Sequence, residues 1–131
     1  MERAFPAANC AADPVLTLAV QAMCRIPAQR KDAHVVATAV WAKASTIVTH
    51  NIEDFAPMVM QHYGLAKIRP DAFCVELLAN RQAEVLAGLR EHRNSLKRPQ
   101  MDPAQYVTHL STPDLGLTRF SRRLQAHPGS I

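Results

Sequence analysis

Two short apolar segments, residues 45–49 and 65–68, each lie between helical signals, and this alternation constrains the fold more than any other feature. The first has the β-branched sequence Ser-Thr-Ile-Val-Thr, typical of a buried strand. Helical spacing precedes it from Asp32, and helix starts follow at Asn51 and at Pro70-Asp71. A chain that alternates helix and strand builds a parallel sheet. The sequence therefore predicts an α/β domain over residues 1–80.

Residues 81–131 have a different pattern, because helical spacing is no longer interrupted by β-branched segments. One amphipathic helix is predicted around Val85 to Leu89, and two more open at Asp102-Pro103 and Thr112-Pro113. The polar stretch at residues 94–100 is the predicted flexible joint between the first and the second of these helices. We therefore expect a helical C-terminal extension over residues 81–131.

In the first part of the chain, helix boundaries are predicted from capping residues and breakers. Asp13-Pro14 predicts the start of a helix that ends before Pro27. A second helix is expected from Asp32 to about residue 44. A third is expected to begin at Asn51 and to stop at Gly64.

Charge and cysteine content narrow the class of protein. The net charge is +4, and residues 81–131 account for it with eight Lys/Arg against four Asp/Glu. An excess of positive charge favours anionic partners. The three cysteines form no CxxC pair, which indicates reduced thiols, and no apolar run is long enough for a membrane span. We therefore expect a cytoplasmic protein without membrane contact.

Polar residues are expected to converge at one edge of the predicted sheet. A helix beginning at Asp32 and a strand ending at Thr49 run in opposite directions over similar lengths. Asp32, Thr49, Asn51 and Asp54 should therefore share the rim where open α/β sheets bind ligands. Spacing alone leaves two interpretations open. Asp32 and Asn51 are either helix caps or part of a site for Mg²⁺ or Mn²⁺, ions that prefer oxygen ligands.

The segments Lys31-Asp32-Ala33-His34-Val35-Val36-Ala37-Thr38-Ala39 and Ile47-Val48-Thr49-His50-Asn51-Ile52-Glu53-Asp54-Phe55 resemble the second half of a PIN domain. The PIN domain is the metal-dependent ribonuclease fold of VapC-like toxins. Tyr63-Gly64-Leu65 and Arg69-Pro70-Asp71-Ala72-Phe73 continue the resemblance, which is closest to a bacterial subgroup with a helical C-terminal extension. It implies a three-layer parallel sheet, which is incomplete in this chain.

The resemblance also implies roles for particular residues. Asp32 matches an acid that holds Mg²⁺ or Mn²⁺, and Thr49 matches a hydroxyl that lines the site. Asn51 stands where the family often has an Asp, so that Asp54 is the candidate acid. Asp32 and Asp54 are thus the predicted catalytic and metal-binding residues. The resemblance implies an RNA substrate and a cognate antitoxin as partners. Whether the protein forms a homodimer stays an open question.

Two acids expected from the family, on the first strand and on an early helix, have no counterpart before Asp32. The resemblance therefore implies an incomplete site whose activity requires further carboxylates. Arg93, Lys97 and Arg98 are the predicted RNA contacts, within a wider basic surface that could also include Arg90, Arg119, Arg122 and Arg123. The leading hypothesis is a VapC-like endoribonuclease. The alternatives are a non-catalytic remnant that binds an antitoxin or RNA, and a small basic helical RNA-binding protein.

Overall fold

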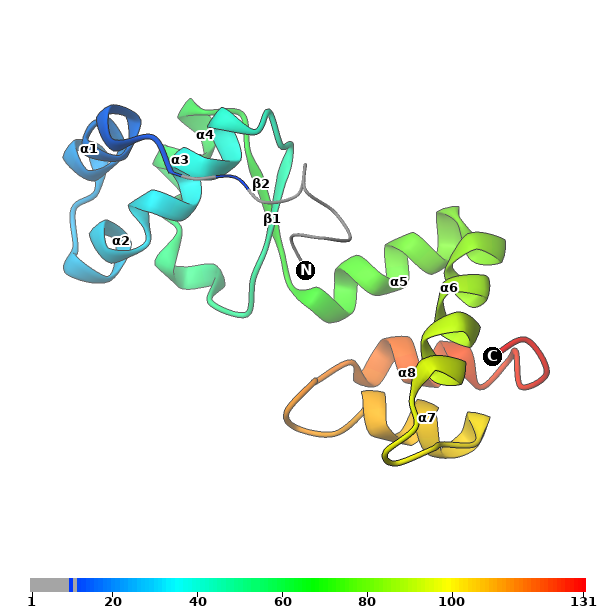
Figure 1. Cartoon of the computed structure of the whole chain (residues 1–131). Coiled ribbons are helices and arrows are strands. Elements are labelled where there is room, and N and C mark those ends of the chain that lie inside the picture. The colour runs from blue at the N-terminus through cyan, green and yellow to red at the C-terminus, as the bar shows by residue number, and fades with distance from the viewer. Residues whose placement is uncertain (1–9, 11) are drawn as a thin grey trace. The chain divides into compact units, whose positions relative to one another are not determined.

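The computed structural model describes residue 10 and residues 12–131 of the chain, which divides into two compact units (Figure 1). Unit 1 is Met1–Arg69 and unit 2 is Pro70–Ile131. The sequence boundary was predicted at residue 80. The units instead divide before Pro70, because the helix that begins there packs against helices later in the chain.

Unit 1 contains a short parallel sheet among helices. Its elements are α1 (Pro14–Met23), α2 (Pro27–Lys31), α3 (Ala33–Trp41), β1 (Thr46–Val48), the 3₁₀ helix η2 (Ile52–Asp54), α4 (Pro57–His62) and β2 (Ala66–Ile68). β1 and β2 pair in parallel, with Ile47 opposite Lys67. The predicted α/β alternation is therefore confirmed. The described residues form a sheet of two strands, and the three-layer PIN arrangement stays a prediction.

The core of unit 1 lies where α1, α3, α4 and the strands meet. α1 packs against α3, and Val20 and Ala37 are fully buried. Ile47 of β1 and Val59 of α4 belong to the same apolar cluster. Burial of this cluster orders the strands, because two strands of three residues are marginal without helices packed on them.

The predicted helix from Asn51 to Gly64 is wrong in its first half. The chain forms only one 3₁₀ turn, η2, and α4 begins six residues later at Pro57. Ala56 has a ψ of 131°, as expected for a residue before proline, and this extended conformation breaks the helix. Lys67 stabilises the break, because its Nζ donates to the carbonyls of Ile52 and Phe55 at 2.9 and 2.6 Å.

α3 and α4 end alike, and each ending leads into a strand. Lys43 (φ 57°) follows α3, and Gly64 (φ 65°) follows α4. The next N–H groups reach back into each helix, from Ala44 to the Ala39 carbonyl and from Leu65 to the Met60 carbonyl. Gly64 is thus confirmed as the stop of α4. α3 ends at Trp41, earlier than the predicted residue 44.

All regular secondary structure of unit 2 is helical. These are α5 (Pro70–Asn80), α6 (Gln82–Ser95), α7 (Pro103–Leu110) and α8 (Thr118–Leu124). Their apolar faces form one core, in which Tyr106, Phe120 and Leu124 are among the most buried side chains. The predicted helical character of the C-terminal part is confirmed.

Local capping decides where α7 begins, whereas α8 begins later than predicted. Asp102 and Gln105 form a reciprocal capping box, so the predicted start at Asp102-Pro103 is confirmed. Thr112-Pro113 opens only a turn, and Gly116 follows with a φ of 65°, which no helix interior accommodates. α8 therefore starts after Leu117.

Candidate functional site

The end of β1 brings two predicted site residues together. The Thr49 N–H donates to the Ile68 carbonyl at 2.9 Å, which extends the pairing of β1 with β2 by one residue. The Thr49 hydroxyl then accepts a hydrogen bond from the Asn51 N–H at 3.0 Å. This contact turns the chain sharply at the carboxyl end of the strand, where open α/β sheets bind ligands.

A polar hollow of about 280 Å³ follows this turn. Its lining residues are His50, Asn51, Ile52, Glu53, Asp54 and Arg69. Arg69 follows β2 and donates from Nη1 to the His50 carbonyl at 3.0 Å, which joins the two strand ends. The hollow therefore contains two carboxylates beside one guanidinium. Sequence reasoning proposed Asp54 but missed Glu53, the acid directly before it, and Arg69.

Asp32 occupies the junction between α2 and α3. It is half-buried, and its side chain makes no hydrogen bond to the N-terminus of α3. Asn51 likewise makes no side-chain cap to η2. The capping interpretation is therefore wrong for both side chains. Asp32 is not among the residues that line the hollow beside Asp54, and the sharing of one site by these two acids stays a prediction.

The fit of a divalent metal depends on how many ligands converge. Within residue 10 and residues 12–131, no group of three or more His, Cys, Asp or Glu side chains is arranged to hold an ion. Mg²⁺ and Mn²⁺ need several oxygen ligands in a defined geometry. These residues therefore do not form a metal centre by themselves, and the predicted ion requires carboxylates in addition to Asp32 and Asp54.

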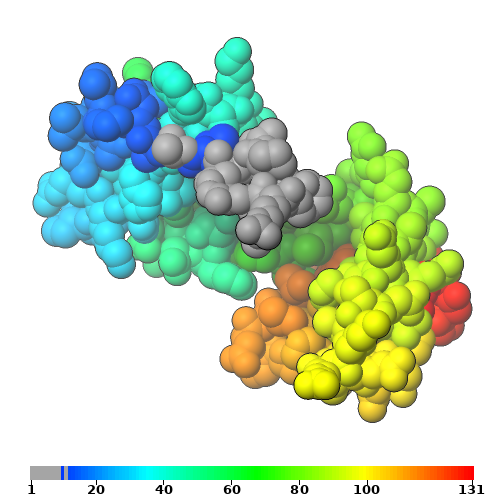
Figure 2. Space-filling model, in the orientation of Figure 1, coloured from blue at the N-terminus to red at the C-terminus, as the bar shows by residue number. Residues whose placement is uncertain are grey.

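The three predicted RNA contacts have different surroundings. Arg93 donates from Nη1 to the Met101 carbonyl at 3.1 Å and from Nη2 to the Ile131 carbonyl at 3.3 Å. Its Nε is buried without a partner in the structure. Arg93 thus connects parts of unit 2, and its donors are turned inward. Lys97 and Arg98 are exposed in the loop after α6, which lies at the surface in Figure 2.

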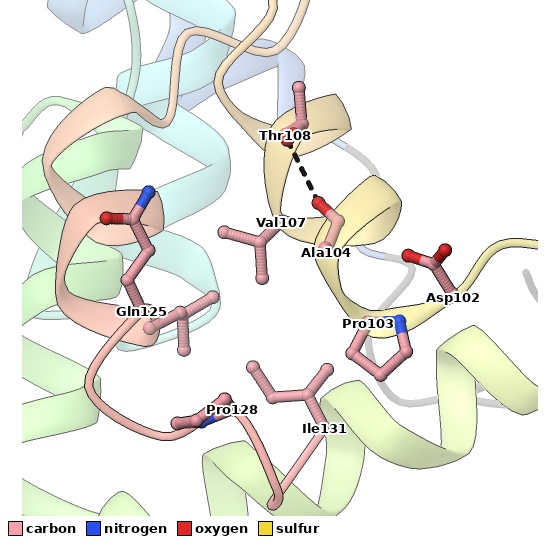
Figure 3. Close-up of a pocket in the computed structure, with 9 residues that line it drawn as sticks. Asp102, Pro103, Ala104, Val107, Thr108, Gln125, Pro128 and Ile131 are labelled. Atoms are coloured by element: carbon pink, nitrogen blue, oxygen red, sulfur yellow. Dashed lines mark hydrogen bonds between the residues drawn. The ribbon is translucent and has the colours of Figure 1, made fainter.

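Unit 2 also contains an apolar hollow of about 450 Å³ between α7, α8 and the end of the chain (Figure 3). Val107 and Ile131 project toward it, and Leu124 contributes to its wall. Asp102 lies at its edge, but its Oδ1 already accepts the Gln105 N–H of the capping box at 2.8 Å. The lining is mainly apolar, and the Asp102 carboxylate at its edge serves as the cap of α7.

The buried titratable groups do not form a nucleophilic site. Burial raises the pKa of the Cys24 thiol, and burial together with the nearby Asp71 carboxylate raises the pKa of Cys74. A catalytic cysteine needs a lowered pKa, so neither thiol is suited to attack a substrate. His92 Nδ1 lies 2.8 Å from the Tyr106 hydroxyl, and this pair joins α6 to α7.

Comparison with known proteins shows a similarity for the second unit. Residues 70–126 match the family model of the VapC50 C-terminal domain, and this range begins where unit 2 begins. No curated protein and no solved structure matches the chain. Within the described residues, no helix combines the length and apolar character that a membrane span requires. Residues 70–126 are therefore similar to the VapC50 C-terminal domain, and the predicted resemblance of the chain to VapC-like toxins is confirmed.

Proposed function

We propose that the chain acts as the toxin of a VapC-like toxin–antitoxin system, and that its reaction is the endonucleolytic hydrolysis of RNA phosphodiester bonds. The observation that carries this proposal is the match of residues 70–126 to the VapC50 C-terminal domain. The parallel pair of β1 and β2 precedes that domain and ends in a hollow that contains carboxylates. This order agrees with a nuclease core followed by a helical extension.

In this proposal Asp32 and Asp54 contribute carboxylates to a site for Mg²⁺ or Mn²⁺, and Thr49 and Asn51 line it. The hydrogen bond between Thr49 and Asn51 would fix the backbone beside Asp54. Because the described residues do not assemble three ligands, catalysis requires carboxylates from elsewhere. The proposed partner is an antitoxin that covers the rim around Asp54, and the proposed location is the cytoplasm.

The test measures cleavage of a labelled RNA by two proteins, the 131-residue chain and the longest open reading frame that contains it. Each is assayed with Mg²⁺, with Mn²⁺ and with EDTA. We expect metal-dependent cleavage by the longer protein, and loss of cleavage in Asp32→Asn and in Asp54→Asn. Glu91→Gln, an exposed acid on α6, is the matched control and should leave cleavage unchanged.

The shorter protein tests the completeness of the site. We expect the 131-residue chain alone to be inactive. Cleavage by this chain that disappears in Asp32→Asn would contradict the incomplete site while leaving the ribonuclease in place. If neither protein cleaves the RNA, the proposed ribonuclease activity is rejected.

The second candidate function is a non-catalytic protein that binds an antitoxin or RNA. The observation in its favour is the lack of a three-ligand group among the described residues. Binding of RNA without cleavage by either protein, unaffected by Asp32→Asn, would support this candidate. The salt dependence of that binding would then report how many phosphates the protein contacts.

A further inference from the structure

α8 presents a face of three arginines to solvent. Phe120, Ser121 and Leu124 are buried, whereas Arg119, Arg122 and Arg123 are exposed. Residues three and four positions apart in a helix are neighbours on one side. The three guanidinium groups therefore project from the same side of α8, opposite the residues that enter the core. We call these three residues the α8 arginine face.

The backbone beneath this face is firmly anchored. The carboxylate of Asp71, in the first turn of α5, accepts the Arg119 N–H at 3.1 Å and the Phe120 N–H at 2.9 Å. The Ser121 hydroxyl donates to the Leu117 carbonyl at 2.7 Å. Because α8 cannot turn about its axis without breaking the contacts with Asp71, the side of the helix that carries the arginines is fixed within unit 2. A partner would meet a pre-organised surface.

Among the described residues, the charges on this face make no ion pair. In the part of the chain that the structure describes, the single ion pair joins Arg81 to Glu84. Arg90 and Arg93 donate to backbone carbonyls in the last residues of the chain. The side chains of the α8 arginine face have no such partner among the described residues. Asp71, which contacts the backbone of Arg119, already accepts two N–H groups.

A hollow of about 240 Å³ adjoins one end of the face. Arg123, Gln82 and His127 line it, and Val75 and Leu78 of α5 form apolar parts of its wall. Guanidinium, amide and imidazole groups all donate hydrogen bonds. The hollow therefore adds donors beside Arg123 that suit the oxygen atoms of a phosphate or a ribose.

We propose that the α8 arginine face is the surface with which unit 2 binds the phosphate backbone of RNA. The chemistry favours RNA over an acidic protein, because protein interfaces centre on exposed apolar and aromatic residues, whereas the apolar residues of α8 are buried. Tyr106 and Phe120 are also buried, so neither can stack on a base. Binding through this face is thus directed at phosphates and is insensitive to base sequence.

This inference rests on the proposed function in one respect, the choice of RNA as the physiological polyanion. It narrows the basic residues predicted as RNA contacts to the three on α8. Arg93 belongs to the same predicted set, and its guanidinium donates to carbonyls within unit 2. Lys97 and Arg98 remain exposed cations on a separate loop and are tested apart from the α8 arginine face.

The test measures binding of a fluorescently labelled RNA hairpin by anisotropy over a range of salt concentrations. The main variant is Arg119→Gln/Arg122→Gln/Arg123→Gln in the full chain. The matched control is Arg25→Gln/Arg30→Gln/Lys31→Gln, which removes the same charge from exposed residues at α2. We expect the main variant to lower the magnitude of the salt slope by about 2 to 3 and to weaken binding at least tenfold. The control should retain the slope of the unmodified chain.

Each other outcome has a defined meaning. No binding of RNA by the unmodified chain at any salt concentration rejects the proposed substrate as well as this surface. If the main variant and the control lose the same amount of RNA affinity, RNA binding stands but its assignment to the α8 arginine face is rejected. Tighter capture of poly-glutamate than of RNA by the same face overturns the choice of RNA. Arg119→Lys/Arg122→Lys/Arg123→Lys, which keeps the charge, should keep the salt slope and so exclude misfolding as the cause.

Discussion

The carboxylate of Asp71 accepts the N–H of Phe120 at 2.9 Å, which joins the first turn of α5 to the first turn of α8. The second carboxylate oxygen accepts the neighbouring Arg119 N–H at 3.1 Å. Leu117 stands at the N-cap position of α8 and has no side chain that accepts a hydrogen bond. Asp71 therefore supplies from a distant helix the cap that α8 lacks locally.

Asp71→Ala should reduce the free energy of unfolding of unit 2 by about 1 to 2 kcal/mol, because two N–H groups at a helix start lose their acceptor. Urea unfolding with hydrogen exchange of peptides from residues 70–131 measures this change. Asp114→Ala, an exposed acid in the loop before α8, is the control and should change the stability little. Equal effects of the two substitutions would contradict the capping role.

Asp13 and Asp32 form a matched pair for unit 1. The Asp13 carboxylate accepts the Leu16 N–H at 3.2 Å, whereas Asp32 makes no such bond to α3. Asp13→Ala should lower the unfolding free energy by about 1 kcal/mol. Asp32→Ala should stay within about 0.5 kcal/mol. The midpoints of urea unfolding measure both, and a larger loss for Asp32 would mean that its carboxylate is structural.

Alkaline pH should destabilise unit 2 through Tyr106. Burial raises the pKa of its hydroxyl above the ordinary tyrosine value. The folded state therefore keeps the proton when the unfolded state has released it. The contribution to stability is complete below a pH of about 10 and is lost as the pH rises through the raised pKa of the folded state.

Tyr106→Phe tests this dependence. The variant should lose about 0.5 to 1.5 kcal/mol at neutral pH, because the hydrogen bond with His92 disappears. Its stability should then fall less steeply than that of the unmodified chain as the pH rises above about 10. Urea unfolding monitored by circular dichroism provides the values. Tyr63→Phe removes a tyrosine hydroxyl from unit 1 and is the control, which should leave the stability of unit 2 at neutral pH unchanged.

Arg93→Met should destabilise unit 2 by about 1 to 3 kcal/mol, since the charged donors to the Met101 and Ile131 carbonyls are removed. Lys97→Met and Arg98→Met remove the same charge from exposed side chains and should change stability little. Thermal unfolding of the three variants provides the comparison. An unchanged midpoint for Arg93→Met would mean that these bonds contribute nothing net.

Local signals predicted much of the fold. The starts at Asp13-Pro14 and Asp102-Pro103 are confirmed, because a cap and its N–H partner lie within three residues of each other. The start of the long helix at Asn51 is wrong, because Pro57 imposes an extended conformation on the residue before it. This restriction was readable in the sequence and outweighs the acids in the first turn.

The candidate site could be predicted only as far as neighbouring residues define it. Thr49 and Asn51 come together, because they are only two positions apart in the chain. Arg69 lies beside the hollow because β1 pairs with β2. No pattern among neighbouring residues predicts this pairing. Asp71 was assigned to the start of its own helix, and its partners lie 48 and 49 residues later. The contact of Arg93 with the Ile131 carbonyl was not predictable for the same reason, because Ile131 lies 38 residues later in the chain.

The span of these contacts has a consequence for how the chain folds while it is being synthesised. The strand pair and the turn contacts of unit 1 involve no residue after Arg69. They can therefore form while unit 2 is still being translated. Unit 2 must wait, because Asp71 needs Phe120 and Arg93 needs Ile131. Its first helix therefore leaves the ribosome long before its partners, and its apolar face is exposed until the last residues emerge.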